Sequence, residues 1–461
     1  MVVKNTLISF ICQLLITLAF LFQASILTIE QGIEVYGVVA SAILLSYRGV
    51  LPAALMGVSD FLIYSDAGKD RSILKVTSFF LWATGCIFIA FLSIISINLV
   101  YSYDINIFYI FFALLQLQLI LIRARITALH HIWIVKIGDT FSALVFVLVT
   151  VFTKNELEYE FIYSLITFVA VLEVILIILI SKYARLNIFL NQKKYSRQLF
   201  DGFSLFALRS FTSIGGSYAD RLIVNAMLGS AVYGIYDLIL RLPRLLKTSG
   251  GLVQAVLFPW MRRGFNVSID DFFIHLHKLK FYLFILFCAL CFFFILNITT
   301  VNEFLYGDIL KPYKALIVAV IVTMMLGSVV NFPYSILISA NLRAKELTAY
   351  SFVTSILKVF FSLMGYFYFG FEGIVYGHLL ISIISWIYVS YIYYSEVYRC
   401  CRIDSSSFFW ELLILIFSII LGLIFFTFIN VSLNSLILSV LVFAFFIFWI
   451  QFRIRDVINL I

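Results

Sequence analysis

The chain has 461 residues, of which 63% are hydrophobic and only 12% are charged, and its mean hydropathy is +1.09. A water-soluble globular protein carries about 25% charged residues, so this composition excludes that class and indicates a polytopic membrane protein. Repeated apolar stretches agree, because about 20 residues are needed to span a hydrocarbon core as a helix. We therefore predict an all-α membrane fold.

The apolar stretches predict fourteen membrane-spanning helices, and an even number places both termini on the same side. The first stretch follows a single lysine and has no small-residue cleavage site, so we expect a retained helix and not a signal peptide. In chain order the predicted helices cover residues 7–29, 37–62, 76–100, 107–122, 137–153, 161–180, 201–224, 231–257, 281–301, 315–340, 347–369, 373–394, 408–429 and 432–450.

Lysine and arginine are distributed unevenly between the two sets of loops. The termini and the alternate loops on one side hold 22 of them, including Arg123, Lys136 and Lys280, whereas the opposite loops hold only three. Short loops rich in lysine and arginine remain in the cytoplasm. We therefore predict cytoplasmic termini, and no loop on either side is long enough to form a folded domain.

Seven cations fall within the predicted spans, and we count four anions as lying within the membrane. A charge at the centre of a membrane helix costs about 2.5 to 3.5 kcal/mol, so these side chains must face protein or a water-filled cavity. The cations are Arg48, Arg209, Arg221, Arg241, Arg244, Lys247 and Lys358, and the anions are Asp60, Glu173, Asp220 and Asp237. Each anion is a candidate for proton or cation coupling, or for a buried ion pair between helices.

The excess of positive charge predicts a site for an anionic ligand. Arginine suits such a site because it remains charged and grips phosphate oxygens with two parallel hydrogen bonds. Helical spacing also places Asp237, Arg241 and Arg244 on one stripe of a helix, and Arg209 with Asp220 on a stripe of the preceding helix. Both stripes can face one shared space.

The six cysteines are too dispersed for a disulfide framework. Cys288 and Cys291 have C-x-x-C spacing, but no second pair or nearby histidine completes a metal site. We interpret these two, together with Cys12 and Cys86, as small buried hydrophobic residues, and we predict neither a metal nor a cofactor.

An internal repeat divides the chain. Val-Tyr-Gly triplets begin at Val35 and at Val232, 197 residues apart, and each precedes a helix with an arginine at mid-depth. This interval corresponds to six helices, so we predict two parallel six-helix lobes around a central cavity, followed by a helix pair. The predicted boundaries are 1–198, 199–395 and 396–461.

The segment ADRLIVNAMLGSAVYGIYDLILRL, with PWMRR after it and SILISANLRAKELTAYS further along, resembles the polysaccharide-transport branch of the multidrug/oligosaccharidyl-lipid/polysaccharide (MOP) superfamily. Within that branch the sequence is most similar to the Wzx-type O-antigen flippases. The resemblance implies a multi-pass protein of the bacterial inner membrane. It would move undecaprenyl-diphosphate-linked oligosaccharide units for lipopolysaccharide or related polysaccharides, with two lobes that rock between inward-open and outward-open forms.

The resemblance also suggests roles and partners. Arg48, Arg209, Arg241, Arg244 and Lys358 would bind the diphosphate, H⁺ or Na⁺ would couple at the four anions, and the partners would be membrane lipids and other polysaccharide assembly proteins. We expect no nucleic-acid partner, and no phosphate-binding loop for ATP hydrolysis is present in the sequence. The alternatives are a membrane glycan polymerase or ligase, disfavoured by the short external loops, and a multidrug exporter, disfavoured by the basic cavity.

Overall fold

A computed structural model of the protein describes residues 2–44, 131–153, 159–183, 198–244, 269–340 and 344–401, with scattered positions between 115 and 126 and residues 413 and 416. Over these ranges the secondary structure is helical throughout. Six stretches of the described residues are long and apolar enough to cross a membrane. The protein is thus a multi-pass helical membrane protein, as predicted.

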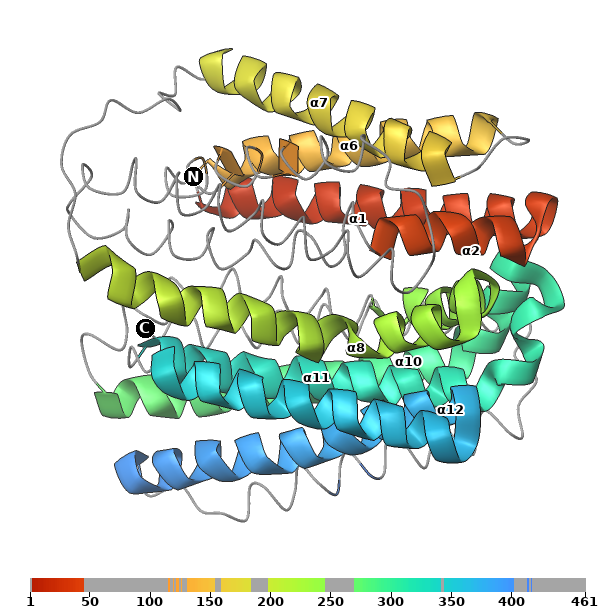
Figure 1. Ribbon diagram of the computed structural model, residues 1–461. Helices are drawn as coiled ribbons and strands as arrows, with labels where there is room; N and C mark the ends of the chain where they lie inside the picture. Colours follow the sequence, from red (N-terminus) through yellow and green to blue (C-terminus); the bar gives the residue numbers. More distant parts are fainter. Residues whose placement is uncertain are drawn as a thin grey trace. The chain divides into compact units, whose positions relative to one another are not determined.

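The helices follow the predicted order (Figure 1). Their bounds are α1, Val2–Ile26; the π-helix η1, Leu27–Gln31; α2, Ile33–Ala42; α6, Ile132–Phe152; α7, Tyr159–Tyr183; α8, Gln198–Arg241; α10, Ile269–Tyr306; the 3-10 helix η3, Gly307–Tyr313; α11, Lys314–Ala340; and α12, Ala344–Cys401. The predicted helices 76–100, 408–429 and 432–450, with most of 37–62 and 107–122, lie outside the described residues. The number fourteen therefore stays a prediction.

Two glycines separate helices that run together in sequence. Gly229 has φ 82° and ψ 174° inside α8, and Gly370 has φ 62° and ψ −140° inside α12. An L side chain is strained at these angles, whereas glycine adopts them freely, so each glycine reverses the chain in a single residue. The predicted pairs 201–224 with 231–257, and 347–369 with 373–394, are therefore adjacent helices that meet at one glycine.

The chain divides into two compact units, Met1–Asp237 with Thr348–Val359, and Leu238–Leu347 with Phe360–Ile461. In the first unit α6 packs between α1 and α7 (Figure 1). Its apolar contacts include Ile134 and Ile177, both fully buried. The predicted lobe boundaries at 198 and 395 remain predictions.

Large apolar side chains also cover the outside of these helices. Phe22 is 60% exposed, Phe168 56% and Phe152 78%. Exposed apolar surface of this extent marks contact with a membrane, because water would penalise it. The first unit is therefore apolar both in its core and over much of its surface.

In the second unit α10 packs against α11, with η3 joining them. The two halves of α12 approach closely where Gly365 faces Gly373, since a β-carbon on either glycine would collide with the backbone of the other. Cys288 and Cys291 are buried in α10, and Cys12 is buried in α1, which confirms the interpretation of these three as small core residues.

Candidate functional site

Two buried carboxylates of α8 each accept a hydrogen bond from a tyrosine. Asp220 is 4% exposed and accepts from the Tyr236 hydroxyl at 2.6 Å, and Asp237 is 5% exposed and accepts from the Tyr36 hydroxyl at 2.5 Å. Both tyrosines are fully buried. The low local dielectric strengthens such bonds, so each carboxylate is held in place by its partner.

Lys358 comes from α12 and reaches the first half of α8. Its ammonium group donates a hydrogen bond to the Gly216 carbonyl at 2.6 Å. The helices approach here because Gly216 has no side chain: a β-carbon at that position would lie 2.9 Å from the Ser355 hydroxyl oxygen, one turn before Lys358. Among the described residues Lys358 forms no ion pair with a carboxylate, so its contact partner is a neutral carbonyl group.

The remaining predicted diphosphate ligands are placed only in part. Arg209 lies in α8 two helical turns before Gly216, so Lys358 approaches the stretch of α8 that carries Arg209. Arg241 is the last residue of α8, Arg244 follows a turn that contains Pro243, and both residues are partly buried and interact with other groups. Arg48 and Asp60 lie outside the described residues.

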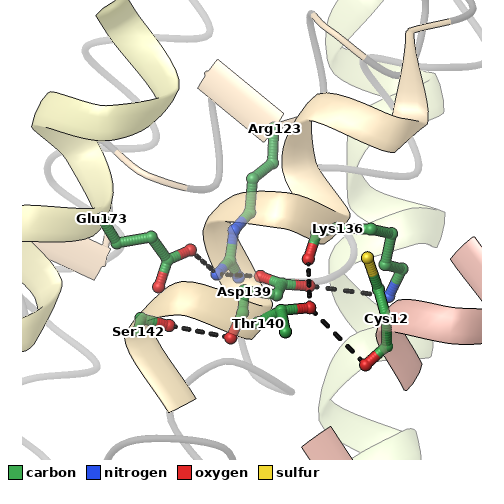
Figure 2. Close-up of polar contacts among 7 residues, drawn as sticks. All are labelled: Cys12, Arg123, Lys136, Asp139, Thr140, Ser142 and Glu173. Carbon is green, nitrogen blue, oxygen red and sulfur yellow. Dashed lines mark hydrogen bonds and ion pairs between the residues drawn. The ribbon is translucent and has the colours of Figure 1, made fainter. Parts of the chain in front are cut away.

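A second polar cluster joins α6, α7 and the helical residue Arg123 (Figure 2). One guanidinium nitrogen of Arg123 donates to the Asp139 carboxylate at 2.6 Å and to the buried Glu173 carboxylate. Lys136 lies 3.5 Å from the other Asp139 oxygen, and the Ser142 hydroxyl donates to the Asp139 backbone carbonyl at 3.0 Å. Two cations thus face two anions, which leaves the cluster without net charge.

The assignment of Arg123, Lys136 and Lys280 to loops was wrong. The structure places all three in helices, and Lys280 is 3% exposed, with its ammonium 4.4 Å from the centre of the Tyr393 ring. These residues were counted with the loops because hydropathy alone placed the ends of the predicted helices, and the observed helices extend beyond those ends. Asp139 was left out of the count of membrane anions, although it is the third residue of the predicted helix 137–153.

The cluster changes the charge balance of the predicted cavity. Glu173 was counted among the anions that offset the mid-helix cations, but its partner is Arg123. Asp139 and Lys136 complete the cluster and balance each other. Without Glu173, one anion fewer offsets the seven mid-helix cations. The excess of positive charge among these residues is therefore larger by one than the count from the sequence.

Comparison with solved structures identifies the fold. A lipid II flippase, MurJ, in an inward closed conformation matches with a TM-score of 0.62 and 13% identity, over 98% of this chain and 100% of that one. An inward-facing multidrug resistance MATE family transporter matches with a TM-score of 0.58 and 12% identity, over 83% and 96%. No family model and no curated protein matches the sequence.

A third match extends the range of pocket chemistry found on this fold. It is a MOP superfamily transporter from Pyrococcus furiosus whose reversed pocket polarity suggests a different function, with a TM-score of 0.57 and 12% identity, over 85% of this chain and 94% of that one. The protein therefore has the fold of MOP superfamily transporters and flippases. At these identities the likeness defines the fold, and the cargo must be argued from the site.

Proposed function

We propose that the protein is a flippase that moves an undecaprenyl-diphosphate-linked oligosaccharide, an O-antigen or related repeat unit, across the bacterial inner membrane by alternating access. Lys358 carries the argument. It lies within a membrane span, and its only hydrogen bond among the described residues goes to the neutral carbonyl of Gly216. The Asp220 carboxylate, one helical turn beyond Gly216, acts electrostatically on Lys358, but the ammonium group has no hydrogen bond to an anion among the described residues, and a diphosphate that visits the site supplies that contact.

Arginine residues join Lys358 in the proposed set. Arg209 lies two turns before Gly216 in the first half of α8, and Arg241 and Arg244, which follow the reversal at Gly229, belong to the set by their sequence positions. Guanidinium groups bind phosphate oxygens in pairs, whereas an ammonium group binds as a point charge, so the set can hold both phosphates of a diphosphate. Arg48 belongs to the proposed set by its sequence position.

The charge of the proposed set favours an anionic, lipid-linked cargo over an organic cation. The fold is similar both to a lipid II flippase and to a MATE transporter, so it does not by itself separate the two kinds of cargo. A pocket for organic cations would require acidic groups, whereas two carboxylates of α8 are already hydrogen-bonded to Tyr36 and Tyr236. The proposed orientation has both termini in the cytoplasm, so the diphosphate enters from the cytoplasmic side.

The test is complementation of a flippase-null bacterium whose repeat unit matches that of this protein. Wild type should restore surface polysaccharide, and Lys358→Ala, Arg209→Ala and Arg244→Ala should not, at equal protein levels in the membrane. Lys358→Arg should retain activity if charge matters. Lys311→Ala is the matched control, because Lys311 is exposed and pairs with Asp308 at 2.7 Å.

The possible outcomes separate the rival functions. Normal polysaccharide in all three alanine variants would refute the diphosphate site. Failure of wild type, with the protein present in the membrane, would favour the polymerase or ligase and the multidrug exporter. Assays of chain length and of drug export would then distinguish those two.

A further inference from the structure

Three charged side chains converge on one stretch of α8. The Lys358 ammonium donates to the Gly216 carbonyl at 2.6 Å, and the Asp220 carboxylate belongs to the next turn of the helix, about 6 Å further along the axis. Arg221 follows Asp220, and its guanidinium lies 5.1 Å from the centre of the Tyr218 ring. Asp220 attracts the charge of Lys358 and Arg221 repels it, so both groups lie within electrostatic range of the ammonium.

Close packing of α8 against the first half of α12 brings these charges together. A β-carbon on Gly216 would lie 2.9 Å from the Ser355 hydroxyl oxygen, and Ser355 comes three residues before Lys358 on the same face of α12. Both stretches belong to one compact unit, Met1–Asp237 with Thr348–Val359. The contact of the two helices therefore holds Lys358 beside the turn of α8 that ends at the buried carboxylate.

Within this group Asp220 is fixed and Lys358 is flexible. The Tyr236 hydroxyl donates to one Asp220 oxygen at 2.6 Å, and both residues are buried. A carboxylate has about four acceptor sites, so a single donor orients it without saturating it. A lysine carries its charge on a flexible four-carbon stem. The ammonium group can therefore shift its position between binding partners, whereas the carboxylate stays in place.

The charges of this stretch do not cancel. Lys358 and Arg221 are cations and Asp220 is an anion, which leaves one positive charge inside the predicted membrane spans. A charge at that depth requires an opposite charge or water. A bound diphosphate would balance the cations, but the site must also be stable before the cargo arrives and after it leaves. Among the described residues, Asp220 is the group that acts on Lys358 with the opposite sign.

We propose that Asp220, positioned by Tyr236, is a built-in counterion of Lys358 that competes with the anionic group of the cargo. In the absence of cargo its charge balances Lys358. When a diphosphate is bound, the carboxylate repels it and limits its affinity, so the cargo can leave when the site opens to the other side. The inference rests on the proposed function for the identity of the cargo, but the competition can be measured without a lipid-linked substrate.

Binding of inorganic diphosphate to the purified protein in detergent tests the competition. Asp220→Asn removes the charge but keeps an oxygen that accepts from Tyr236, so in calorimetry it should bind diphosphate about tenfold more tightly than wild type. Lys358→Ala should bind it more weakly than wild type. Asp308→Asn is the matched control and should bind as wild type does, because Asp308 is 79% exposed and pairs with Lys311.

Transport should change in the opposite direction from binding. In the complementation assay, Asp220→Asn should restore less surface polysaccharide than wild type at equal protein levels, because the cargo leaves more slowly. A purely structural role of Asp220 predicts weaker binding together with weaker transport. Equal or weaker affinity of Asp220→Asn for diphosphate would overturn the proposal, and so would tighter binding with undiminished transport.

The two assays separate the counterion from the proposed function. Tighter binding of diphosphate to Asp220→Asn, with no complementation by wild type, would leave the counterion standing and refute the oligosaccharide cargo. Complementation by wild type, with no gain in affinity in Asp220→Asn, would leave the proposed function standing and refute the counterion. If Asp220→Asn does not fold, Asp220→Ser provides the same test, because a hydroxyl oxygen also accepts a hydrogen bond.

Discussion

The Arg123 cluster predicts a specific pattern of stability. Replacing Arg123 with leucine removes the one cationic partner that Glu173 has in the described part of the chain. Glu173 is 1% exposed, whereas Asp139 keeps Lys136 at 3.5 Å. Removing one partner of a buried pair costs about 3 to 5 kcal/mol, because the other charge is left in a low-dielectric interior. The loss should therefore arise almost entirely at Glu173.

A double-mutant cycle isolates that loss. Glu173→Gln keeps the shape of the side chain and leaves Arg123 with Asp139, so it should cost only about 1 to 2 kcal/mol, the loss of one charge-assisted bond. Adding Glu173→Gln to Arg123→Leu should recover most of the stability, because no buried charge remains. Thermal unfolding in detergent should rank Arg123→Leu lowest, with the double variant near Glu173→Gln. Additive losses in the double variant would refute the reasoning.

Three further substitutions test separate contacts by the same unfolding assay. Tyr236→Phe leaves the buried Asp220 carboxylate without its donor and should cost about 1 to 3 kcal/mol, while Tyr391→Phe, at a side chain that is 71% exposed, should have no effect. Gly229→Ala should cost about 1 to 3 kcal/mol, because φ 82° with ψ 174° lies in a region that essentially only glycine adopts; unchanged stability would show that the turn relaxes. Gly365→Ala should be more damaging than Gly327→Ala, because its β-carbon meets the Gly373 backbone.

Hydropathy predicted the bounds of a helix well where the whole helix is apolar. The predicted helices 161–180 and 315–340 correspond to Tyr159–Tyr183 and Lys314–Ala340. The predicted helix 281–301 was too short, because α10 begins at Ile269, in a stretch with Asp270, Asp271 and Lys278 that no membrane scale favours. Polar helix extensions are stabilised by packing and by backbone hydrogen bonds, so hydropathy does not detect them.

The hydrogen-bond and ion-pair partners of the polar side chains could not be predicted from the sequence in the same way. Arg123 and Glu173 are 50 residues apart, and Lys358 and Gly216 are 142 apart, so only the packing of the helices brings them together. The polar stripe on α8 was predicted by helical spacing, which is local. Its partners come from other helices, and a single sequence contains no information on which faces meet.

The repeat shows how the local and the distant signals combine. The 197-residue interval predicted two equivalent lobes, but equivalence alone does not say that the equivalent glycines touch. In the structure they do, since a β-carbon on Gly234 would lie 3.0 Å from the Gly37 α-carbon. The structure also shows an asymmetry, because the position equivalent to Asp237 in the first copy is Ala40. Only one of the two possible hydrogen bonds of this type can therefore form, from Tyr36 to Asp237. The backbone contact thus follows from the repeat, whereas this hydrogen bond depends on a residue that only one copy carries.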